Sequence, residues 1–223
     1  MIKLSSNSYR DLNFSFSNEI ARIANKFGLS GSEVIEKANY GYERNNIAKP
    51  SLGVGGFCLP KDPILFEKLV KGGKGYSMGK LSRKINYDIM RFTFNRLIKL
   101  LKKNKGNKKV LILGIAFKGL PETVDTRNSS ALFLGKFLRK KGIQCDYTDP
   151  MSSRMIKMKS VLGINILEKI KNTNIYDLIV MVNNNPYYLN LLEKNLKMNN
   201  SKNKKFLFDC WNMIDKNYVK NLN

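Results

Sequence analysis

The sequence predicts an α/β protein in two parts: a helical central domain, residues 1–105, and a Rossmann-like domain with a doubly wound parallel sheet, residues 106–223. Apolar residues recur at helical spacing through the first part. From Lys109 onward, short apolar runs alternate with amphipathic helices, the pattern of a parallel sheet with right-handed crossovers. The segment 102–109 between them is charged and poor in apolar residues, so we place the boundary there.

The first part begins with a helix that ends at Gly28 and carries one apolar stripe, formed by Phe16, Ile20, Ile23 and Phe27. Ser30 and Glu33 have capping-box spacing and open a short second helix. After an irregular segment, 39–51, comes a glycine-rich loop, 53–63. It leads into a helix at 64–70, with Asp62 expected as N-cap and Pro63 as its first residue.

A break at 72–75 precedes a long helix from Lys80 to Lys103. Its stripe consists of Leu81, Ile85, Ile89, Phe92, Arg96 and Leu100. A helix of this length in a small domain often forms an interface between domains or subunits. We therefore expect a homodimer through Lys80–Lys103.

In the second part we expect strands at 110–113, 143–147, 178–182 and 206–208, with helices at 129–141, 161–171 and 187–197. Ligands of such sheets bind at the carboxyl ends of the strands. The residues expected along that rim are Gly114 to Lys118, Asp149, Asn183 to Asn185, and Asp209.

The composition is that of an ordinary globular protein, with 43% hydrophobic and 26% charged residues among 223. No apolar run approaches the roughly 20 residues of a membrane helix, and the N-terminus has no apolar signal segment. The three cysteines lie far apart, which favours a reducing compartment over disulfides or a zinc site. We expect a cytoplasmic protein without a metal.

Histidine is absent, which excludes Ser-His and Cys-His nucleophile pairs and histidine-ligated metals. Lys, Asp, Glu, Cys, Tyr or Arg must carry any proton chemistry. The formal charge of +23 raises the alternative of nucleic-acid binding. The lysines are spread along the chain, however, and no recognition motif accompanies them, so we expect attraction of anionic ligands and no specific nucleic-acid partner.

Cys58 is the candidate nucleophile, although most lone cysteines are simply buried apolar residues. It follows Gly55-Gly56, which allows close approach of the backbone, and precedes a predicted helix N-terminus. That terminus and nearby Lys61 would favour the thiolate. In the second part, the turn 114–119 is typical of phosphate binding but is not the GxGxxG dinucleotide motif, and Asp149 is the one feature that supports NAD there.

Four motifs in order together resemble the UDP-glucose/GDP-mannose dehydrogenase family over essentially the whole chain. They are Lys3-Leu-Ser-Ser-Asn7 with Arg10-Asp11-Leu12-Asn13; Gly53-Val-Gly-Gly-Phe-Cys58-Leu-Pro-Lys-Asp62; Leu113-Gly-Ile-Ala-Phe-Lys118 with Asp125-Thr-Arg127; and Tyr147-Thr-Asp149-Pro150 with Asp209-Cys-Trp-Asn212. The cysteine loop is the most specific of them.

The resemblance implies oxidation of a UDP-sugar at C6 with NAD, through a thiohemiacetal and a thioester on Cys58. Lys3 and Asn7 would stabilise the oxyanion, and Asp62 would handle a proton or water. The resemblance further implies that substrate is bound by Arg44, Lys49, Gly55, Phe117, Lys118 and Arg127, with Arg127 having a structural alternative.

Three features depart from the family pattern. Only Met1 and Ile2 precede Lys3, where family members carry an NAD-binding domain, so we expect that domain to be supplied separately. The stretch from Lys118 to Arg127 is longer than usual, and Trp211 stands where a smaller or basic residue is common. The alternative is a catalytically inactive module that binds a nucleotide sugar and dimerises.

Overall fold

The computed structural model describes residues 1–69, 77–103, 108–196 and 206–214. The chain forms two compact units, Met1–Thr93 and Phe94–Asn223. The domain boundary expected near residue 105 stays a prediction. The break at 72–75, the end of the helix expected at 64–70 and part of the segment 102–109 lie outside the described residues.

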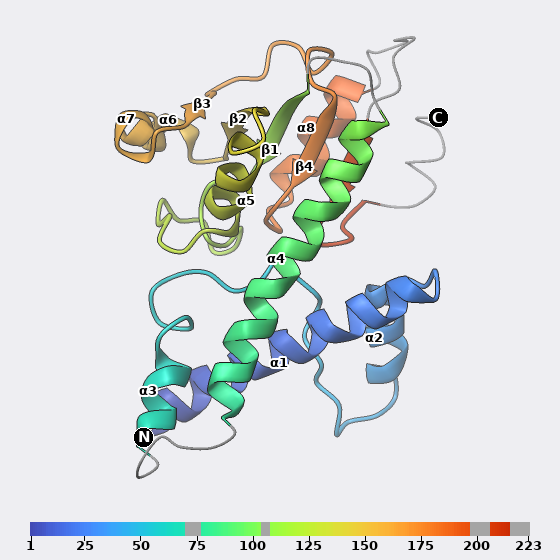
Figure 1. The fold of residues 1–223 in the computed structure, drawn as a ribbon, viewed down its shortest axis with the longest axis vertical. Coiled ribbons are helices and arrows are strands. Elements are labelled where there is room, and N and C mark those ends of the chain that lie inside the picture. Colours follow the sequence, from blue (N-terminus) through green and yellow to red (C-terminus); the bar gives the residue numbers. More distant parts are fainter. Residues whose placement is uncertain (70–76, 104–107, 197–205, 215–223) are drawn as a thin grey trace. The chain divides into compact units, whose positions relative to one another are not determined.

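The first unit is helical, as predicted (Figure 1). It contains α1 (Ile2–Lys26), α2 (Gly31–Asn39), α3 (Asp62–Lys68) and the first part of α4 (Met78–Lys102). The capping prediction at Ser30 is confirmed, since its hydroxyl accepts a hydrogen bond from the Glu33 amide at 3.4 Å. Helix α1 begins well ahead of Phe16, the residue at which its apolar stripe starts.

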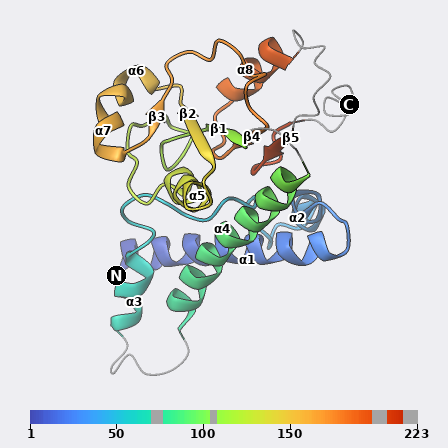
Figure 2. The same cartoon turned by 45° about the horizontal axis from the view of Figure 1, so that its top comes forward.

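The buried face of α1 is polar. Phe16 and Phe27 are 52% and 74% exposed, whereas Asp11, Ser15 and Asn18 are buried. Figure 2 shows α1 passing across the first part of α4. At this crossing Asp11 accepts a hydrogen bond from Arg83 of α4, and Asn18 donates one to Asn86 of α4. The helix is therefore held to its neighbour by polar contacts, and its apolar stripe faces outward.

The second unit is the predicted doubly wound sheet, with five parallel strands in the order β3-β2-β1-β4-β5. The strands are β1 (Lys109–Leu113), β2 (Gln144–Thr148), β3 (Asn165–Ile166), β4 (Leu178–Met181) and β5 (Phe206–Asp209). The connecting helices are α5 (Ser130–Arg139), α6 (Ser152–Met155), η1 (Ile156–Met158), α7 (Lys159–Leu162) and α8 (Tyr187–Leu196).

The prediction of a helix at 161–171 is wrong. The helical turns lie earlier, at 152–162, and Gly163 ends α7 in the left-handed conformation, with φ 59°. The chain then enters β3, which pairs with β2. The glycine reverses the chain, so the apolar spacing that follows it belongs to a strand and not to a helix.

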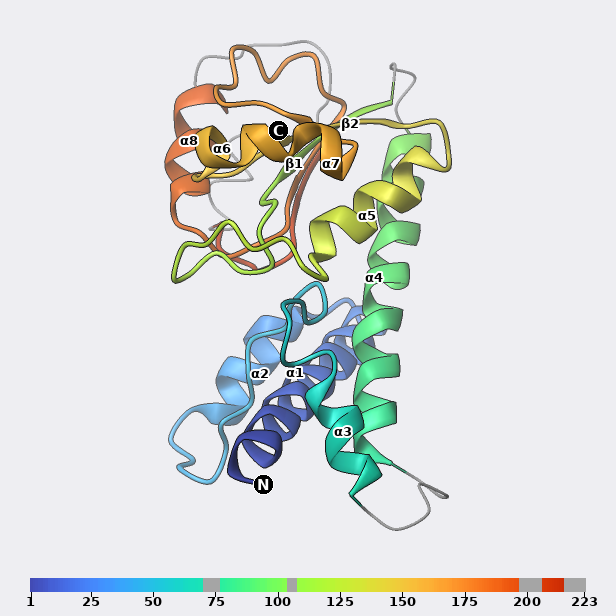
Figure 3. The same ribbon diagram turned by 90° about the vertical axis from the view of Figure 1, so that its left-hand side faces the viewer.

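Helices α5 and α8 cover opposite faces of the sheet (Figure 3). Leu111, Leu113 and Ile179 point to the α8 side, where they pack with Tyr188 and Leu192. This alternation follows from the two-residue period of strands. No helix in the part of the chain that the structure describes is long and apolar enough to cross a membrane.

Candidate functional site

Cys58 lies in the turn that starts α3. Its carbonyl oxygen accepts hydrogen bonds from the Lys61 and Asp62 amides at 3.1 and 2.9 Å. The prediction that Cys58 directly precedes a helix is therefore confirmed. Gly56, two residues earlier, has φ +85°, a conformation that favours glycine. Gly55 is half-buried beside it.

Asp62 is the first residue of α3 and not its N-cap, so that prediction is wrong. Its carboxylate turns away from the helix amides: Oδ2 accepts a hydrogen bond from Asn7 Nδ2 at 2.7 Å, and Oδ1 accepts one from Lys61 Nζ at 2.6 Å. The hydrogen bond from Lys61, then that from Asn7, and the nearby charge of Lys3 hold the pKa of Asp62 below its ordinary value. Asp62, which is 1% exposed, is thus a carboxylate at neutral pH.

The structure brings the four predicted catalytic residues into one region of the first unit. Lys3 and Asn7 are four residues apart on α1 and therefore share one helix face. Asn7 bonds to Asp62, and the Asp62 amide bonds to Cys58. The Asn7 carboxamide and the Asp62 carboxylate are thus in direct contact, the Lys3 ammonium is close enough to act on that carboxylate, and the backbone of Cys58 is bonded to the backbone of Asp62; the roles of the four residues stay predictions.

The other two cysteines are poor nucleophiles. Burial raises the pKa of the Cys145 thiol to about 12, and burial raises the pKa of Cys210 well above its ordinary value. Both are therefore thiols at neutral pH, and the thiolate is the nucleophilic form. Cys58, which is half-buried, is the remaining candidate.

Arg44 and Lys49 are exposed and have no described hydrogen bond with the Cys58 loop. Arg44 lines a hollow of about 340 Å³ together with aromatic side chains of α1, Tyr9 and Phe16. No residue of the loop from Gly53 to Lys61 lines this hollow. The structure therefore places Arg44 on another part of the first unit and does not connect Lys49 to the cysteine.

The three predicted substrate residues of the second unit lie together after β1. The guanidinium of Arg127 binds both carboxylate oxygens of Asp125, with its Nη2 at 2.7 Å. The Phe117 amide donates to the Asp125 carbonyl at 3.0 Å, and Lys118 Nζ lies 5.5 Å from the Phe117 ring. Arg127 thus forms a local ion pair, which is the structural role expected as the alternative to substrate binding. The ammonium of Lys118 remains as a cation at the carboxyl rim of the sheet.

The turn after β1 does not fit NAD. The carboxylate of Asp149, at the end of β2, accepts hydrogen bonds from the Ile115 and Ala116 amides at 2.8 and 3.2 Å. Its other oxygen accepts one from the Met151 amide at 3.0 Å. These amides would have to cradle a pyrophosphate, and Asp149 would have to bind a ribose. Because the Asp149 carboxylate is hydrogen-bonded to these amides, the amides are not available to a pyrophosphate, and the carboxylate is not available to a ribose.

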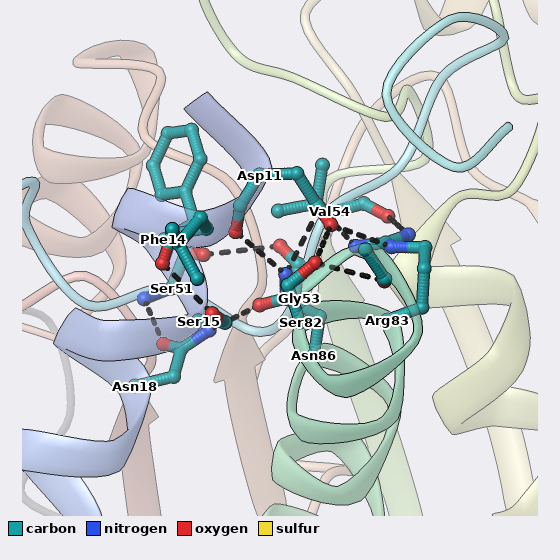
Figure 4. A network of polar contacts seen from close by, with 12 residues as sticks. Asp11, Phe14, Ser15, Asn18, Ser51, Gly53, Val54, Ser82, Arg83 and Asn86 are labelled. Atoms are coloured by element: carbon teal, nitrogen blue, oxygen red, sulfur yellow. Dashed lines mark hydrogen bonds and ion pairs between the residues drawn. The ribbon is translucent and has the colours of Figure 1, made fainter. Parts of the chain in front are cut away.

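Sequence reasoning missed a buried polar network behind the cysteine loop (Figure 4). Asp11 of α1 binds Ser82, Arg83 and Asn86 of α4, and Asn18 joins Asn86 to the loop. A signal was present: the polar residues at positions 3, 7, 11, 15 and 18 repeat at helical spacing. Because a polar stripe is ordinarily typical of a solvent-exposed helix face, this spacing indicates one continuous polar face, and only the structure shows that the face is buried.

Comparison with known proteins decides the family. Residues 1–88 match the central domain of the UDP-glucose/GDP-mannose dehydrogenase family, and residues 111–216 match its UDP binding domain. The chain belongs to the UDP-glucose/GDP-mannose dehydrogenase family. The resemblance found in the four sequence motifs is thereby confirmed.

The similar members of this family are UDP-sugar dehydrogenases. UDP-N-acetyl-D-mannosamine dehydrogenase of Methanocaldococcus jannaschii is 32% identical over 217 residues, which are 97% of this chain and 47% of that protein. The enzyme of that name from Pyrococcus horikoshii is 36% identical over 153 residues, 67% of this chain and 35% of that protein. A solved UDP-D-ManNAc dehydrogenase structure from P. horikoshii superposes with TM-score 0.75 at 28% identity, covering 97% of this chain and 48% of that one. The chain thus spans about half the length of such relatives, or less.

Proposed function

We propose that this chain supplies the cysteine-bearing and UDP-binding parts of a UDP-sugar 6-dehydrogenase, which oxidises the C6 hydroxyl of a UDP-sugar to a carboxylate. The observation that carries the proposal is the grouping of Asn7, Cys58 and Asp62, with Lys3 close enough to act on the charge of Asp62. UDP-N-acetyl-D-mannosamine is the sugar nucleotide for which the similar proteins are named.

Cys58 acts as the nucleophile in this proposal. Its sulfur adds to the C6 aldehyde and forms a C–S bond, and the aldehyde oxygen becomes an oxyanion that takes up a proton. Loss of a second hydride from C6 and of the hydroxyl proton would convert this thiohemiacetal into a thioester. Water then attacks the C6 thioester, the C–S bond breaks, and the carboxylate leaves with the thiol restored. The covalent bond keeps the reactive aldehyde from escaping between the two oxidations.

In this proposal Lys3 and Asn7 oppose the negative charge that develops near Cys58. Lys3 carries an ammonium, and the Asn7 amide has a second N–H besides the one that Asp62 accepts. Asp62 is ionised, and both its oxygens have donors. To orient the hydrolytic water, it must therefore release one of these donors, and the Lys61 side chain, which is 42% exposed, is one that solvent can reach.

NAD is the hydride acceptor implied by the family, and when bound it takes up the hydrides removed from C6. Since the turn after β1 does not fit NAD, we assign its binding to a domain that works with this chain, in the same polypeptide or a separate one. Lys118 at the rim is proposed to face the phosphates of the UDP-sugar. The homodimer through residues 80–103 also stays a prediction, supported by the exposed side chains of Leu81 and Tyr87.

The test combines the chain with an NAD-binding domain of this family, a UDP-sugar and NAD, and follows NADH absorbance. We expect Cys58→Ser to abolish NADH formation and Cys210→Ser to leave it unchanged, because the pKa of the Cys210 thiol is raised well above its ordinary value and the thiol is protonated. Calorimetric titration of UDP onto the chain alone serves as a second readout. UDP binding without Cys58-dependent NADH formation would support the inactive binding module; absence of both would reject the proposal.

A further inference from the structure

The cysteine loop is anchored at its start as well as at its end. Its end, Cys58 to Asp62, is held by α3 and Asn7. At its start, the Ser51 amide donates to Asn18 Oδ1 at 2.8 Å, and the Ser51 hydroxyl donates to the Gly53 carbonyl at 3.0 Å. Gly53 itself lies so close to α4 that an added Cβ would stand 2.5 Å from the Asn86 carbonyl oxygen.

Asp11 is the centre from which these contacts extend. Its carboxylate, 0% exposed, receives hydrogen bonds from Ser82 Oγ at 2.6 Å and from Asn86 Nδ2 at 3.0 Å. The guanidinium of Arg83 binds both of its oxygens, with Nε at 2.9 Å. A buried carboxylate with this many donors holds its partners in one geometry.

Two routes connect Asp11 to the loop (Figure 4). In the first, Asn86 accepts a hydrogen bond from Asn18 at 3.0 Å, and Asn18 accepts from the Ser51 amide. In the second, Arg83 Nη1 donates to the Val54 carbonyl at 3.5 Å. Both routes end within a few residues of Cys58, and only Gly55, Gly56 and Phe57 lie between Val54 and the sulfur-bearing residue.

We propose that Asp11 is a positioning residue: through Arg83, Asn86 and Asn18 it fixes the start of the cysteine loop and so keeps Cys58 beside Lys3. This inference rests on the proposed function for the role of Cys58. The same helix α1 then carries both the groups that face the reacting centre, Lys3 and Asn7, and the group that places the nucleophile. A loop with two adjacent glycines needs such an anchor, because glycine gives the backbone wide conformational freedom.

Two measurements on the chain test the proposal. The first is deuterium uptake by the amides of residues 51–58, with helix 31–39 as internal reference. We expect Asp11→Asn and the milder Ser51→Ala to speed exchange in 51–58 by about five-fold or more, as loss of a hydrogen bond does. Ser15→Ala is the matched control, because Ser15 is buried on the same face of α1 but, among the described residues, its hydroxyl bonds within α1 itself, to the Leu12 carbonyl at 2.7 Å.

The second measurement is the ratio of the rates at which iodoacetate and iodoacetamide alkylate Cys58, read by peptide mass spectrometry. Iodoacetate is an anion and iodoacetamide is neutral, so the ratio of their rates reports the charge near the thiol. A change in the accessibility of the thiol affects both rates alike and cancels in the ratio. Lys3→Ala should lower it about two- to three-fold, the effect of one nearby unit charge in water. Ser51→Ala, which leaves every charge in place, should also lower it, whereas Ser15→Ala should not change it.

The outcomes separate this inference from the proposed function. Unchanged exchange in 51–58 for both Asp11→Asn and Ser51→Ala, or a rise that is equal in helix 31–39, overturns the inference. So does a wild-type alkylation ratio in Ser51→Ala when Lys3→Ala lowers it. A wild-type ratio in Lys3→Ala itself counts against the proposed function, and the exchange data then decide the anchoring role by themselves.

Discussion

Gly53 offers a sharp test of how tightly the cysteine loop packs on α4. It has φ +76°, and a Cβ there would meet the Asn86 carbonyl oxygen at 2.5 Å. Gly28 is a matched control: its φ is +71°, but nothing lies within 4 Å of the added Cβ. Both substitutions to alanine place a residue with a Cβ in the left-handed conformation, which costs about 1–2 kcal/mol. Alanine also lowers the conformational entropy of the unfolded chain, which offsets about 0.4–1 kcal/mol of that cost in both variants.

Only Gly53→Ala adds a clash with helix backbone, and insertion of a methyl group into a packed site costs about 1–3 kcal/mol. We therefore expect Gly53→Ala to lower the free energy of unfolding by about 1–3 kcal/mol more than Gly28→Ala. Urea unfolding followed by far-ultraviolet circular dichroism measures the difference, and fluorescence of Trp211 follows the second unit separately. Equal losses in the two variants would refute the close packing of the loop on α4.

Ionisation and exposure lead to three further expectations. Because the pKa of Asp62 is lowered on folding, its contribution to stability is present above the unfolded value of about 4 and is lost as the pH falls through the folded value. The difference in urea stability between wild type and Asp62→Asn should therefore be constant from about pH 5 to 7 and shrink below about pH 4; a constant difference down to about pH 3 would contradict this. In native protein at neutral pH, iodoacetamide should label Cys58 first, Cys210 more slowly because its pKa is raised, and the buried Cys145 only after unfolding; early labelling of Cys145 would contradict its burial. Arg127→Ala should change the free energy of unfolding by less than about 1 kcal/mol, because the side chain is 59% exposed and water screens its ion pair; a much larger loss would show that the pair with Asp125 is not screened in this way.

The fold could be read from the sequence wherever apolar spacing and turn residues agree. The strand at 110–113, the cap at Ser30 and the helix at 187–196 are of this kind. The failure at 161–171 occurred because Gly163 reverses the chain inside a stretch whose apolar spacing suits either a helix or a strand. Local periodicity does not distinguish the two when the segment is short.

The site was predictable in its residues and less so in its contacts. The motif around Cys58 indicated the nucleophile, but the capping rule that assigned Asp62 to its own helix is local. It could not detect that Asn7, 55 positions away, donates to the same carboxylate. The network around Asp11 was missed for a related reason: the apolar stripe of α1 drew attention to the face that is exposed, while the buried face is polar.

The central claim is that Cys58 forms a covalent bond to the sugar during oxidation. The most direct measurement is peptide mass spectrometry after acid quenching of the chain during turnover with an NAD-binding domain, NAD and a UDP-sugar. We predict the added mass of the oxidised UDP-sugar on the peptide that contains Cys58, and none on the peptides of Cys145 or Cys210. Turnover that continues in Cys58→Ala, or an adduct found only on another residue, would contradict it.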